Sequence, residues 1–450
     1  MDKTEKYYLK MTTTSVEKLI VTLGIPTTIS MLITNIYNLV DTYFVGSLGE
    51  SQQAATGVLF TLQFIIQAFA FMFGHGSGVY VSKELANKDV EKASKYVTSA
   101  IIIGVIVGLV ISIFGLIFLE PFMKILGSTD TILPYAKDYG LWVLISCPFM
   151  IVSLILNNNL RYEGKAFYSM IGLSVGAILN IFGDYLLIER LELGVYGAGL
   201  STAVSQIVSC TILFVFFMKM AQSKIRFSYI SKDVKLYLNI CKVGLPSLIR
   251  QGLSSISNGL LNNLTKQFGD AAIAAMSVVN RFSSFVMCVG LGIGQGFQPV
   301  SSFNYEAKEY KRVKKGFVFT MLFGFVLVGL LSLFGLIIPE KIIWLFQKSE
   351  NVISVGTFAL RMASIGVMFL PISVTVNMLY QSIRKAKAAS FLSLLRSGLT
   401  FIPILLIGVH FFGLAGIQCA QPISDILSSL ISLPFGLHFL RKTPNKQSGY

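Results

Sequence analysis

Long apolar runs alternate with short polar stretches along almost the whole chain. Residues 97–119, 139–160 and 316–338 carry no charge over the roughly 20 positions that a bilayer-spanning helix needs. The pattern predicts twelve membrane spans, at approximately 17–45, 52–80, 97–119, 136–156, 167–188, 195–217, 237–265, 272–303, 316–338, 352–379, 388–408 and 414–438. We therefore expect an all-α membrane protein with many crossings.

Composition supports the same fold class. The chain has 450 residues, of which 54% are hydrophobic and 13% charged, too many apolar side chains to hide in water-soluble domains. Lys3, Lys6 and Lys10 precede a first run that is too long for a signal-peptide core, so the N-terminus is expected to be retained. The five cysteines lie in apolar segments without metal-ligand spacing and are expected to be reduced packing residues.

Positive charge follows the predicted topology. The N-terminus, the loops after the even-numbered spans and the C-terminal tail hold 25 of the 37 Lys and Arg, and the alternate loops hold five. This bias predicts that both termini face the cytoplasm and that the protein lies in the cytoplasmic membrane. The net charge of +15 is then explained by topology and by anionic lipid headgroups, and nucleic acid is not expected as a partner.

The two halves of the chain repeat each other. A fixed offset of 220 residues pairs glycines, prolines and charges over 24–95 and 244–315, among them Gly24 with Gly244, Pro26 with Pro246, Gly49 with Gly269, Gly76 with Gly296, Lys88 with Lys308 and Lys95 with Lys315. Nearly the same offset pairs Asn157 with Asn377 and Gly197 with Gly416. Because six spans is an even number, the halves form parallel pseudo-symmetric six-helix bundles: an N-lobe (1–221), a cytoplasmic linker (222–235) and a C-lobe (236–450).

Two parallel bundles that enclose a central cleft are typical of transporters that expose a site alternately to each side of the membrane. The three histidines are scattered and no catalytic constellation occurs, so the chain is not expected to be an enzyme. No phosphate-binding G-x-x-x-x-G-K-[ST] loop and no repeated selectivity filter occur, which disfavours a nucleotide-driven pump and a channel. An ion gradient is the expected source of energy.

Two acids interrupt the apolar runs. Asp41 and Asp184 lie at matching depths near the ends of the first and fifth spans, where an ionised side chain costs about 2.5–3.5 kcal/mol or more. Asn180 is four residues before Asp184 and shares its helix face, and Asn35 and Asn38 extend the polar stripe near Asp41. The pair is predicted to hold one proton or one hard cation such as Na⁺; the alternative is that each acid caps a helix end or meets interfacial water.

Several further residues are candidates with two interpretations. Pro26 is either a hinge in the first span or a structural kink. An arginine within a span either binds an anionic group of the substrate, or has a structural role in which it pairs with a carbonyl or extends its charged end to the membrane surface. The structural role is favoured for Arg250 and Arg396. Arg281 and Arg361 are candidates for a substrate cavity. Asn35, Asn38 and Asn157 are candidates for the same cavity. Asp425 is predicted to balance one of the arginines, with a second ion site as the alternative.

Five motifs together resemble the multidrug and toxic compound extrusion family, in the prokaryotic type with paired N-lobe aspartates. They are Gly24-Ile25-Pro26, Asp41-Thr42-Tyr43-Phe44-Val45-Gly46, Gly74-His75-Gly76-Ser77-Gly78, Leu179-Asn180-Ile181-Phe182-Gly183-Asp184 and Gly194-Val195-Tyr196-Gly197-Ala198. The resemblance implies a V-shaped pair of six-helix lobes that exports amphiphilic drugs in exchange for H⁺ or Na⁺. Lipid bilayer and small-molecule substrate are the implied partners, no other cofactor is needed, and a monomer suffices.

The resemblance also implies a cation site in the N-lobe. It falls on Asp41, Asn180, Asp184 and Thr202, with the carbonyl of Ala198 nearby, and the first four would be metal ligands only if Na⁺ is the coupling ion. Helices 7 and 10, which carry acids in some members, have none here, which favours a single ion site. The intramembrane arginines leave one alternative function, a flippase or exporter of lipid-linked or anionic metabolites built on the same two bundles.

Overall fold

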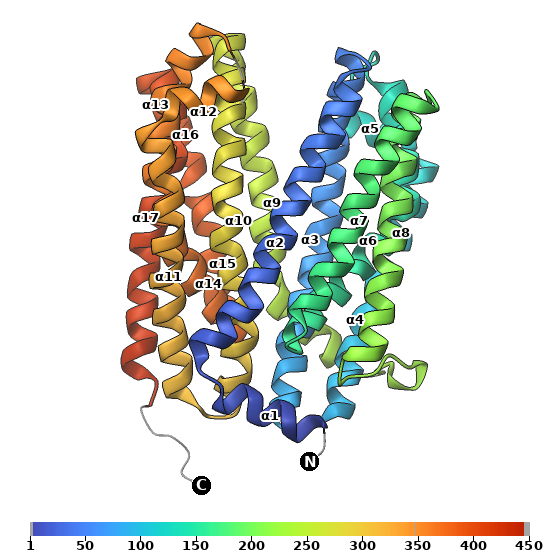
Figure 1. Ribbon diagram of the computed structural model, residues 1–450, viewed down its shortest axis with the longest axis vertical. Coiled ribbons are helices and arrows are strands. Elements are labelled where there is room, and N and C mark those ends of the chain that lie inside the picture. The colour runs from blue at the N-terminus through green and yellow to red at the C-terminus, as the bar shows by residue number, and fades with distance from the viewer. Residues whose placement is uncertain (1–2, 347, 445–450) are drawn as a thin grey trace. The chain divides into compact units, whose positions relative to one another are not determined.

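The computed structural model describes residues 3–346 and 348–444, and helices make up nearly all of this part (Figure 1). The elements are α1 (Lys3–Thr13), α2 (Val16–Gly46), α3 (Glu50–Ala86), α4 (Val90–Ile117), α5 (Leu119–Ile125), α6 (Leu133–Tyr162), α7 (Ala166–Asp184), η1 (Tyr185–Arg190), α8 (Gly194–Met220), η2 (Phe227–Tyr229), α9 (Val234–Thr265), η3 (Lys266–Phe268), α10 (Asp270–Glu306), α11 (Tyr310–Ile337), α12 (Pro339–Phe346), α13 (Glu350–Met368), α14 (Leu370–Ser382), α15 (Ala386–Leu394), η4 (Leu395–Leu399), α16 (Phe401–Phe412) and α17 (Leu414–Lys442).

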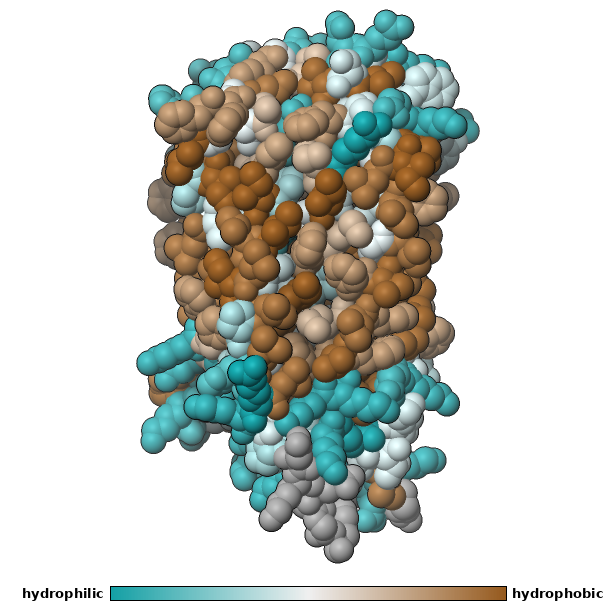
Figure 2. Space-filling view, turned by 90° about the vertical axis from the view of Figure 1, so that its left-hand side faces the viewer, coloured by the Kyte–Doolittle hydropathy of each residue, from teal (hydrophilic) through white to brown (hydrophobic). Residues whose placement is uncertain are grey.

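Eleven helical stretches among the described residues are long and apolar enough to cross a membrane. Three of them combine shorter elements, namely 166–190, 350–382 and 386–412. α9 has 32 residues, but Lys235, Lys242, Arg250 and many Ser and Asn residues make it more polar than the others. One face of the molecule is apolar over its middle and hydrophilic at both ends (Figure 2). The expected all-α, multi-pass membrane fold is confirmed.

The chain forms two compact units. The first contains residues 1–8 and 29–251, and the second contains residues 9–28 and 252–450. In the first unit α6 packs against α3, α4 and α8, and in the second α10 packs against α11, α13 and α14. Three helices, α1, α2 and α9, each contribute residues to both units.

Close glycine crossings hold the shared helices. In the second unit the N-terminal half of α2 crosses α10, where a Cβ atom on Gly296 would lie 2.5 Å from the backbone nitrogen of Gly24 (Figure 1). In the first unit α9 crosses α3, where a Cβ atom on Gly244 would overlap the carbonyl oxygen of Met72. The offset of 220 residues pairs Gly24 with Gly244 and Gly76 with Gly296, and a Cβ atom on Gly76 would likewise overlap the backbone of α9, so equivalent backbone contacts occur in the two units.

Because of these crossings, the packing units do not coincide with the repeated halves of the sequence. The predicted boundaries were 1–221, 222–235 and 236–450, but residues 9–28 pack in the second unit and residues 222–251 in the first. An ion pair between Glu17 and Lys315, with oxygen and nitrogen 2.7 Å apart, adds to the packing of α2 in the second unit. The predicted boundaries therefore describe the sequence repeat. In the packing, the first half of α2 belongs to the second unit and the first half of α9 belongs to the first unit.

The predicted linker is anchored to the first unit by hydrogen bonds. The backbone N–H groups of Lys224 and Ser231 donate to Ser94 Oγ and Ser99 Oγ on α4, at 2.8 and 3.1 Å. Glu163, the buried residue that follows α6, accepts hydrogen bonds from the Ser223 hydroxyl and the Gln222 backbone N–H. Burial raises the pKa of Glu163 to about 7, although these hydrogen bonds act in the opposite direction.

Gly244→Ala is predicted to destabilise the folded protein by about 1–3 kcal/mol, because the new methyl group would displace α9 from α3. The thermal unfolding midpoint of purified protein in detergent is the measurement. Gly252→Ala is the matched control on the same helix, because its Cβ would meet no atom within 4 Å. Equal midpoints for the two variants would contradict the account of the crossing.

Glu163 is predicted to make stability depend on pH. Its folded-state pKa of about 7 exceeds the ordinary value of 4.5, so its stabilising contribution is complete below about pH 4.5 and disappears as the pH rises through 7. Glu163→Gln should therefore flatten the decline in unfolding midpoint between pH 5 and 8. Glu91→Gln, at an exposed position on α4, should leave the decline unchanged. A decline of unaltered slope in Glu163→Gln would refute the assignment.

Candidate functional site

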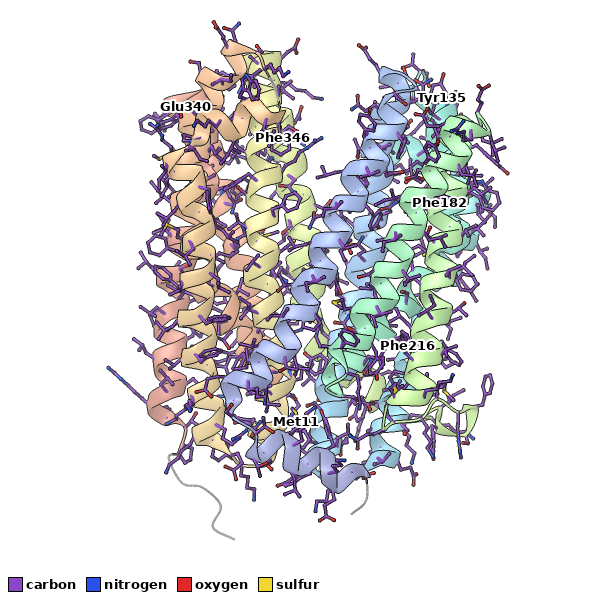
Figure 3. The ribbon with its side chains drawn as sticks, viewed as in Figure 1. Met11, Tyr135, Phe182, Phe216, Glu340 and Phe346 are labelled. Atoms are coloured by element: carbon purple, nitrogen blue, oxygen red, sulfur yellow. The ribbon has the colours of Figure 1, made fainter. Side chains whose placement is uncertain are left out.

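Asp41 on α2 and Asp184 at the end of α7 are both buried inside the first unit. They are close enough to interact electrostatically with each other. Phe182, two residues before Asp184, lies on the exposed side of α7 (Figure 3), which is the alternation expected when a helix turns its polar face inward. Asp184 makes no capping hydrogen bond, so the helix-cap alternative is wrong for this residue.

A tyrosine from α6 connects α2 to α8 at the same place. The hydroxyl of Tyr139 donates to Asp41 Oδ2 at 3.0 Å, and it lies 3.2 Å from Thr202 Oγ1. Both Tyr139 and Thr202 are buried. One hydroxyl therefore links the carboxylate on α2 to the hydroxyl on α8.

Asn180 on α7 is fixed by two hydroxyl groups of α8. Its Nδ2 donates to Ser201 Oγ and to Thr202 Oγ1, both at 3.2 Å. The Ser201 hydroxyl in turn donates to the Asn180 carbonyl oxygen at 2.9 Å. These bonds hold the amide so that its oxygen, Oδ1, is the atom left for another partner.

Four buried oxygens of the site accept no hydrogen bond from the described residues. They are Asp41 Oδ1, Asn180 Oδ1 and both carboxylate oxygens of Asp184. A buried acceptor without a donor costs free energy, and more so when it is charged. The arrangement fits a positive partner, because a proton or a hard cation would satisfy oxygens that the protein leaves without donors.

The backbone of α7 changes winding directly after Asp184. Residues 185–190 form the π-helical turn η1, with the Leu191 N–H donating to the Leu186 carbonyl at 3.0 Å. π-Helical turns are rare in proteins, and those that occur are often found at functional sites. Here the turn separates the buried carboxylate from the end of the helix.

The cation site implied by the family resemblance is largely brought together. Asp41, Asn180, Asp184 and Thr202 are buried in one unit and connected as described, and Ala198 is buried one helical turn before Thr202 on α8. Tyr139 and Ser201 belong to the same network but were not predicted from the sequence. A tyrosine or serine near the end of a span carries no charge that would mark it, so sequence reasoning had no signal for either.

The remaining candidates on α2 are half-buried. Asn35 Nδ2 donates to the Met31 carbonyl at 3.1 Å, and the Asn38 carbonyl accepts from the Thr42 hydroxyl at 2.8 Å. α2 continues unbroken through Pro26, so the proline does not divide the helix. Whether Pro26 acts as a hinge stays a prediction.

Asn157 has a structural hydrogen bond that recurs in the second unit. Its Nδ2 donates to the Ser169 carbonyl at 3.1 Å, and Asn377 Nδ2 donates to the Ala389 carbonyl at 2.7 Å, in each case twelve residues ahead. In both units the amide connects the end of one helix to the start of the next. This repetition favours a structural role for Asn157 over the predicted role in a substrate cavity.

The two arginines assigned to the cavity are both exposed. Arg361 on α13 forms an ion pair with Glu340 on α12, with Nη2 and Oε1 3.1 Å apart and both side chains about half exposed. Arg281 lies on α10. Both arginines belong to the second unit, and their role in a substrate cavity stays a prediction.

The second unit has no acid pair at the equivalent place. The offset of 220 residues places Leu261 at the position of Asp41 and Ala359 at the position of Tyr139. Both belong to a buried apolar cluster that also includes Phe401 and Leu405. The repeat thus builds a polar site in one unit and an apolar core in the other.

Comparison with known proteins identifies the family. The MatE family model matches residues 26–186 and again residues 246–407, once in each half of the repeat. The chain belongs to the MatE family. Two curated relatives, both called multidrug export protein MepA, come from Staphylococcus saprophyticus and Staphylococcus aureus. The first is 26% identical over 438 residues, 96% of both chains, and the second is 28% identical over 415 residues, 91% of both.

A solved structure shares the fold of this MatE protein. It is described as the outward-facing conformation of a multidrug resistance MATE family transporter of the MOP superfamily. The TM-score is 0.90 at 23% identity, and the match covers 97% of this chain and 99% of the other. The expected family and the expected two-lobe helical fold are confirmed.

Asn157→Ala and Asn377→Ala are predicted to destabilise the protein to a similar degree, each by about 1–3 kcal/mol, because each removes a buried hydrogen bond that connects two helices. Thermal unfolding midpoints of the purified variants provide the measurement. Asn351→Ala is the control, because this asparagine is exposed on α13. Large destabilisation by Asn377→Ala with none by Asn157→Ala would contradict the structural assignment.

Proposed function

We propose that this protein is a cation-coupled antiporter that exports amphiphilic small molecules across the cytoplasmic membrane by alternating access. Asp41, Asn180, Asp184 and Thr202 would hold the coupling ion, H⁺ or Na⁺. The observation that carries the proposal is the set of four buried oxygens without hydrogen-bond donors in the first unit. A cation that binds there neutralises charge which the surrounding side chains do not neutralise.

The ligand set suits either ion. Two carboxylates that interact with each other can share one proton, and their titration then belongs to the pair. Carboxylate, amide and hydroxyl oxygens are also the ligands that hard cations prefer. No cluster of three His, Cys, Asp or Glu side chains occurs in the described part of the chain, so neutral oxygens of Asn180 and Thr202 would complete a sodium site.

Helix α2 supplies a route from the ion to the rest of the protein. Asp41 lies on the half of α2 that belongs to the first unit, and the half with Pro26 belongs to the second. A change of charge at Asp41 would therefore act on a continuous helix that both units share. We propose that this shared helix couples ion binding to the exposure of a substrate site.

The substrate class and the topology follow from the relatives and from charge. Relatives named multidrug export proteins match over more than nine-tenths of both chains, which supports export of varied amphiphilic molecules. The distribution of Lys and Arg supports cytoplasmic termini. Two complete units in one chain make a monomer sufficient for transport.

The alternative, a flippase or exporter of lipid-linked or anionic metabolites, required a strongly cationic cleft. Of the four intramembrane arginines, Arg361 pairs with Glu340, and Arg396 pairs with Asp425. These acids offset the charge of two arginines. The buried acid pair of the first unit therefore favours cation-coupled export.

Asp41→Asn and Asp184→Asn are each predicted to abolish gradient-driven export, because an amide neither releases a proton nor neutralises a cation. The measurement is efflux of a fluorescent amphiphilic dye from vesicles that contain the purified protein, with H⁺ and Na⁺ gradients imposed separately. Asp138→Asn is the matched control, since Asp138 is an exposed acid of the same unit next to Tyr139.

Loss of export in both variants, with normal export in Asp138→Asn, is the expected result, and the gradient that drives the wild type identifies the ion. Wild-type efflux in both Asp41→Asn and Asp184→Asn would overturn the proposal. Folding is checked by comparing the elution profiles of all variants in detergent.

A further inference from the structure

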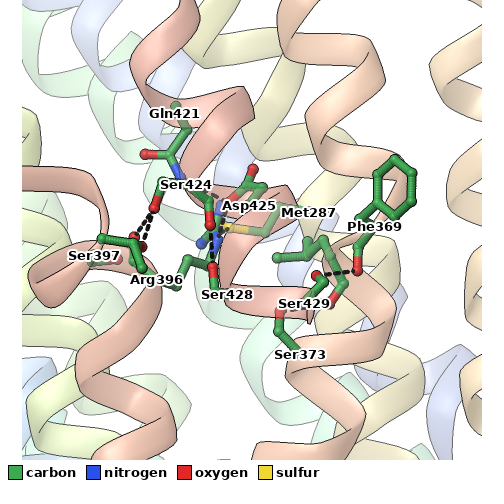
Figure 4. A network of polar contacts seen from close by, with 12 residues as sticks. Met287, Phe369, Ser373, Arg396, Ser397, Gln421, Ser424, Asp425, Ser428 and Ser429 are labelled. Atoms are coloured by element: carbon green, nitrogen blue, oxygen red, sulfur yellow. Dashed lines mark hydrogen bonds and ion pairs between the residues drawn. The ribbon is translucent and has the colours of Figure 1, made fainter. Parts of the chain in front are cut away.

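A second polar network lies inside the second unit, where η4 meets α17 (Figure 4). Arg396 Nε donates to Asp425 Oδ1 at 2.7 Å, and Gln421 Nε2 donates to the same oxygen at 2.8 Å. The prediction that Asp425 balances an intramembrane arginine is confirmed. The network has no part in the acid pair of the first unit.

The ion pair joins only one guanidinium nitrogen of Arg396 to one carboxylate oxygen of Asp425. Arg396 Nη1 lies 3.3 Å from Met287 Sδ, a weak acceptor, and Nη2 has no hydrogen-bond partner among the described residues. A two-armed pair would engage both guanidinium nitrogens and both carboxylate oxygens. The side chain of Arg396 is 22% exposed and that of Asp425 only 3%, so the accessible partner is the cation.

The backbone fixes Arg396 in this position. Residues 395–399 form a π-helical turn, in which the Thr400 N–H donates to the Leu395 carbonyl at 3.0 Å. The Arg396 carbonyl accepts from the Ser424 hydroxyl of α17 at 2.7 Å, and the neighbouring Ser397 carbonyl accepts from the Ser257 hydroxyl of α9. The backbone that carries Arg396 is held from two neighbouring helices and its guanidinium group is oriented by Asp425, which preorganises the side chain for a ligand.

The fold itself does not require these charges. In the first unit the matching helix α7 has no charged residue before Asp184, and Gln206 occupies the place of Asp425. A charged side chain in a membrane span costs about 2.5–3.5 kcal/mol on insertion scales. At the equivalent place the first unit packs without such an ion pair, so the pair in the second unit has another use than packing.

We propose that Arg396 binds the anionic group of an amphiphilic solute, a carboxylate or a sulfonate, through its open Nη2 edge. Gln421 would add a polar contact, and the Met287 thioether would accommodate the apolar part of the solute, because thioethers adapt to varied shapes. Apart from Arg396, Asp425 and Arg281, no charged residue lies in the central parts of α9, α10, α16 or α17 within this unit. The site would therefore take one anionic group.

This inference deepens the proposed function, since it rests on that proposal for the statement that the bound solute is exported. Arg396 would extend the solutes of this protein from cations and neutral amphiphiles to those that carry a carboxylate or sulfonate.

The test compares three pyrene probes that differ only in charge: 1-pyrenebutyrate, its methyl ester and 4-(1-pyrenyl)butylamine. Calorimetry measures their binding to purified protein in nanodiscs, with empty nanodiscs subtracted. The variant is Arg396→Gln/Asp425→Asn, which removes both charges together and leaves no unpaired buried acid. It should weaken butyrate binding about tenfold or more, as expected for loss of a charged hydrogen bond, and leave the ester and the amine unchanged.

A matched double variant serves as the control. Arg361→Gln/Glu340→Gln removes another ion pair of the same unit and should leave butyrate binding unchanged. Failure of the ion-coupling proposal would appear as wild-type efflux in Asp41→Asn and Asp184→Asn, whereas failure of this proposal appears in the binding of butyrate, so the two failures are distinguishable. Arg396→Lys keeps the charge and should weaken butyrate binding less than the double variant does.

Two results would overturn the assignment of an anion site. One is unchanged butyrate binding in Arg396→Gln/Asp425→Asn. The other is an equal loss for all three probes, which would mean that the pair only maintains the fold.

Discussion

The structure depends on a carboxylate pair that is buried without enough hydrogen-bond donors. Tyr139 donates to one oxygen of Asp41, but the other oxygen and both oxygens of Asp184 have no donor among the described residues. An unpaired charge in a membrane-embedded unit is costly. In the proposed function, a bound cation or proton would satisfy these oxygens, and an ion gradient would supply or remove it.

In the proposed mechanism, the exchange of half-helices would let ion binding in the first unit act on both units. α2 and α9 each belong to both packing units, and each crosses its neighbour where glycine lets two backbones touch. Because such contacts admit no side chain, the crossings fix the shared helices firmly in each unit. A continuous helix that packs in both units transmits a displacement that a flexible linker would absorb.

Part of this architecture could be predicted from the sequence. Uninterrupted apolar runs indicate the spans. Asp41 and Asp184 stand out because an acidic residue within an apolar run is rare and costly in a membrane. Tyr139 and Ser201 gave no such signal, since neutral hydroxyl groups are common in spans. The packing units were also missed, because glycine contacts between helices leave no trace in hydropathy. Asn157 was assigned to a cavity because its polarity was visible in the sequence and its partner, the Ser169 carbonyl, was not.

The repeat shows how one fold carries two chemistries. Where the first unit has Asp41 and Tyr139, the second has Leu261 and Ala359 in an apolar cluster, and its charges lie instead on Arg396 and Asp425.

The most direct test of the central claim is the number of cations bound by purified protein in nanodiscs between pH 5 and 8, measured as proton uptake and as binding of radioactive Na⁺. The account predicts that Asp41→Asn/Asp184→Asn binds fewer protons or sodium ions than the wild type. Identical uptake of both ions by the two proteins would contradict it.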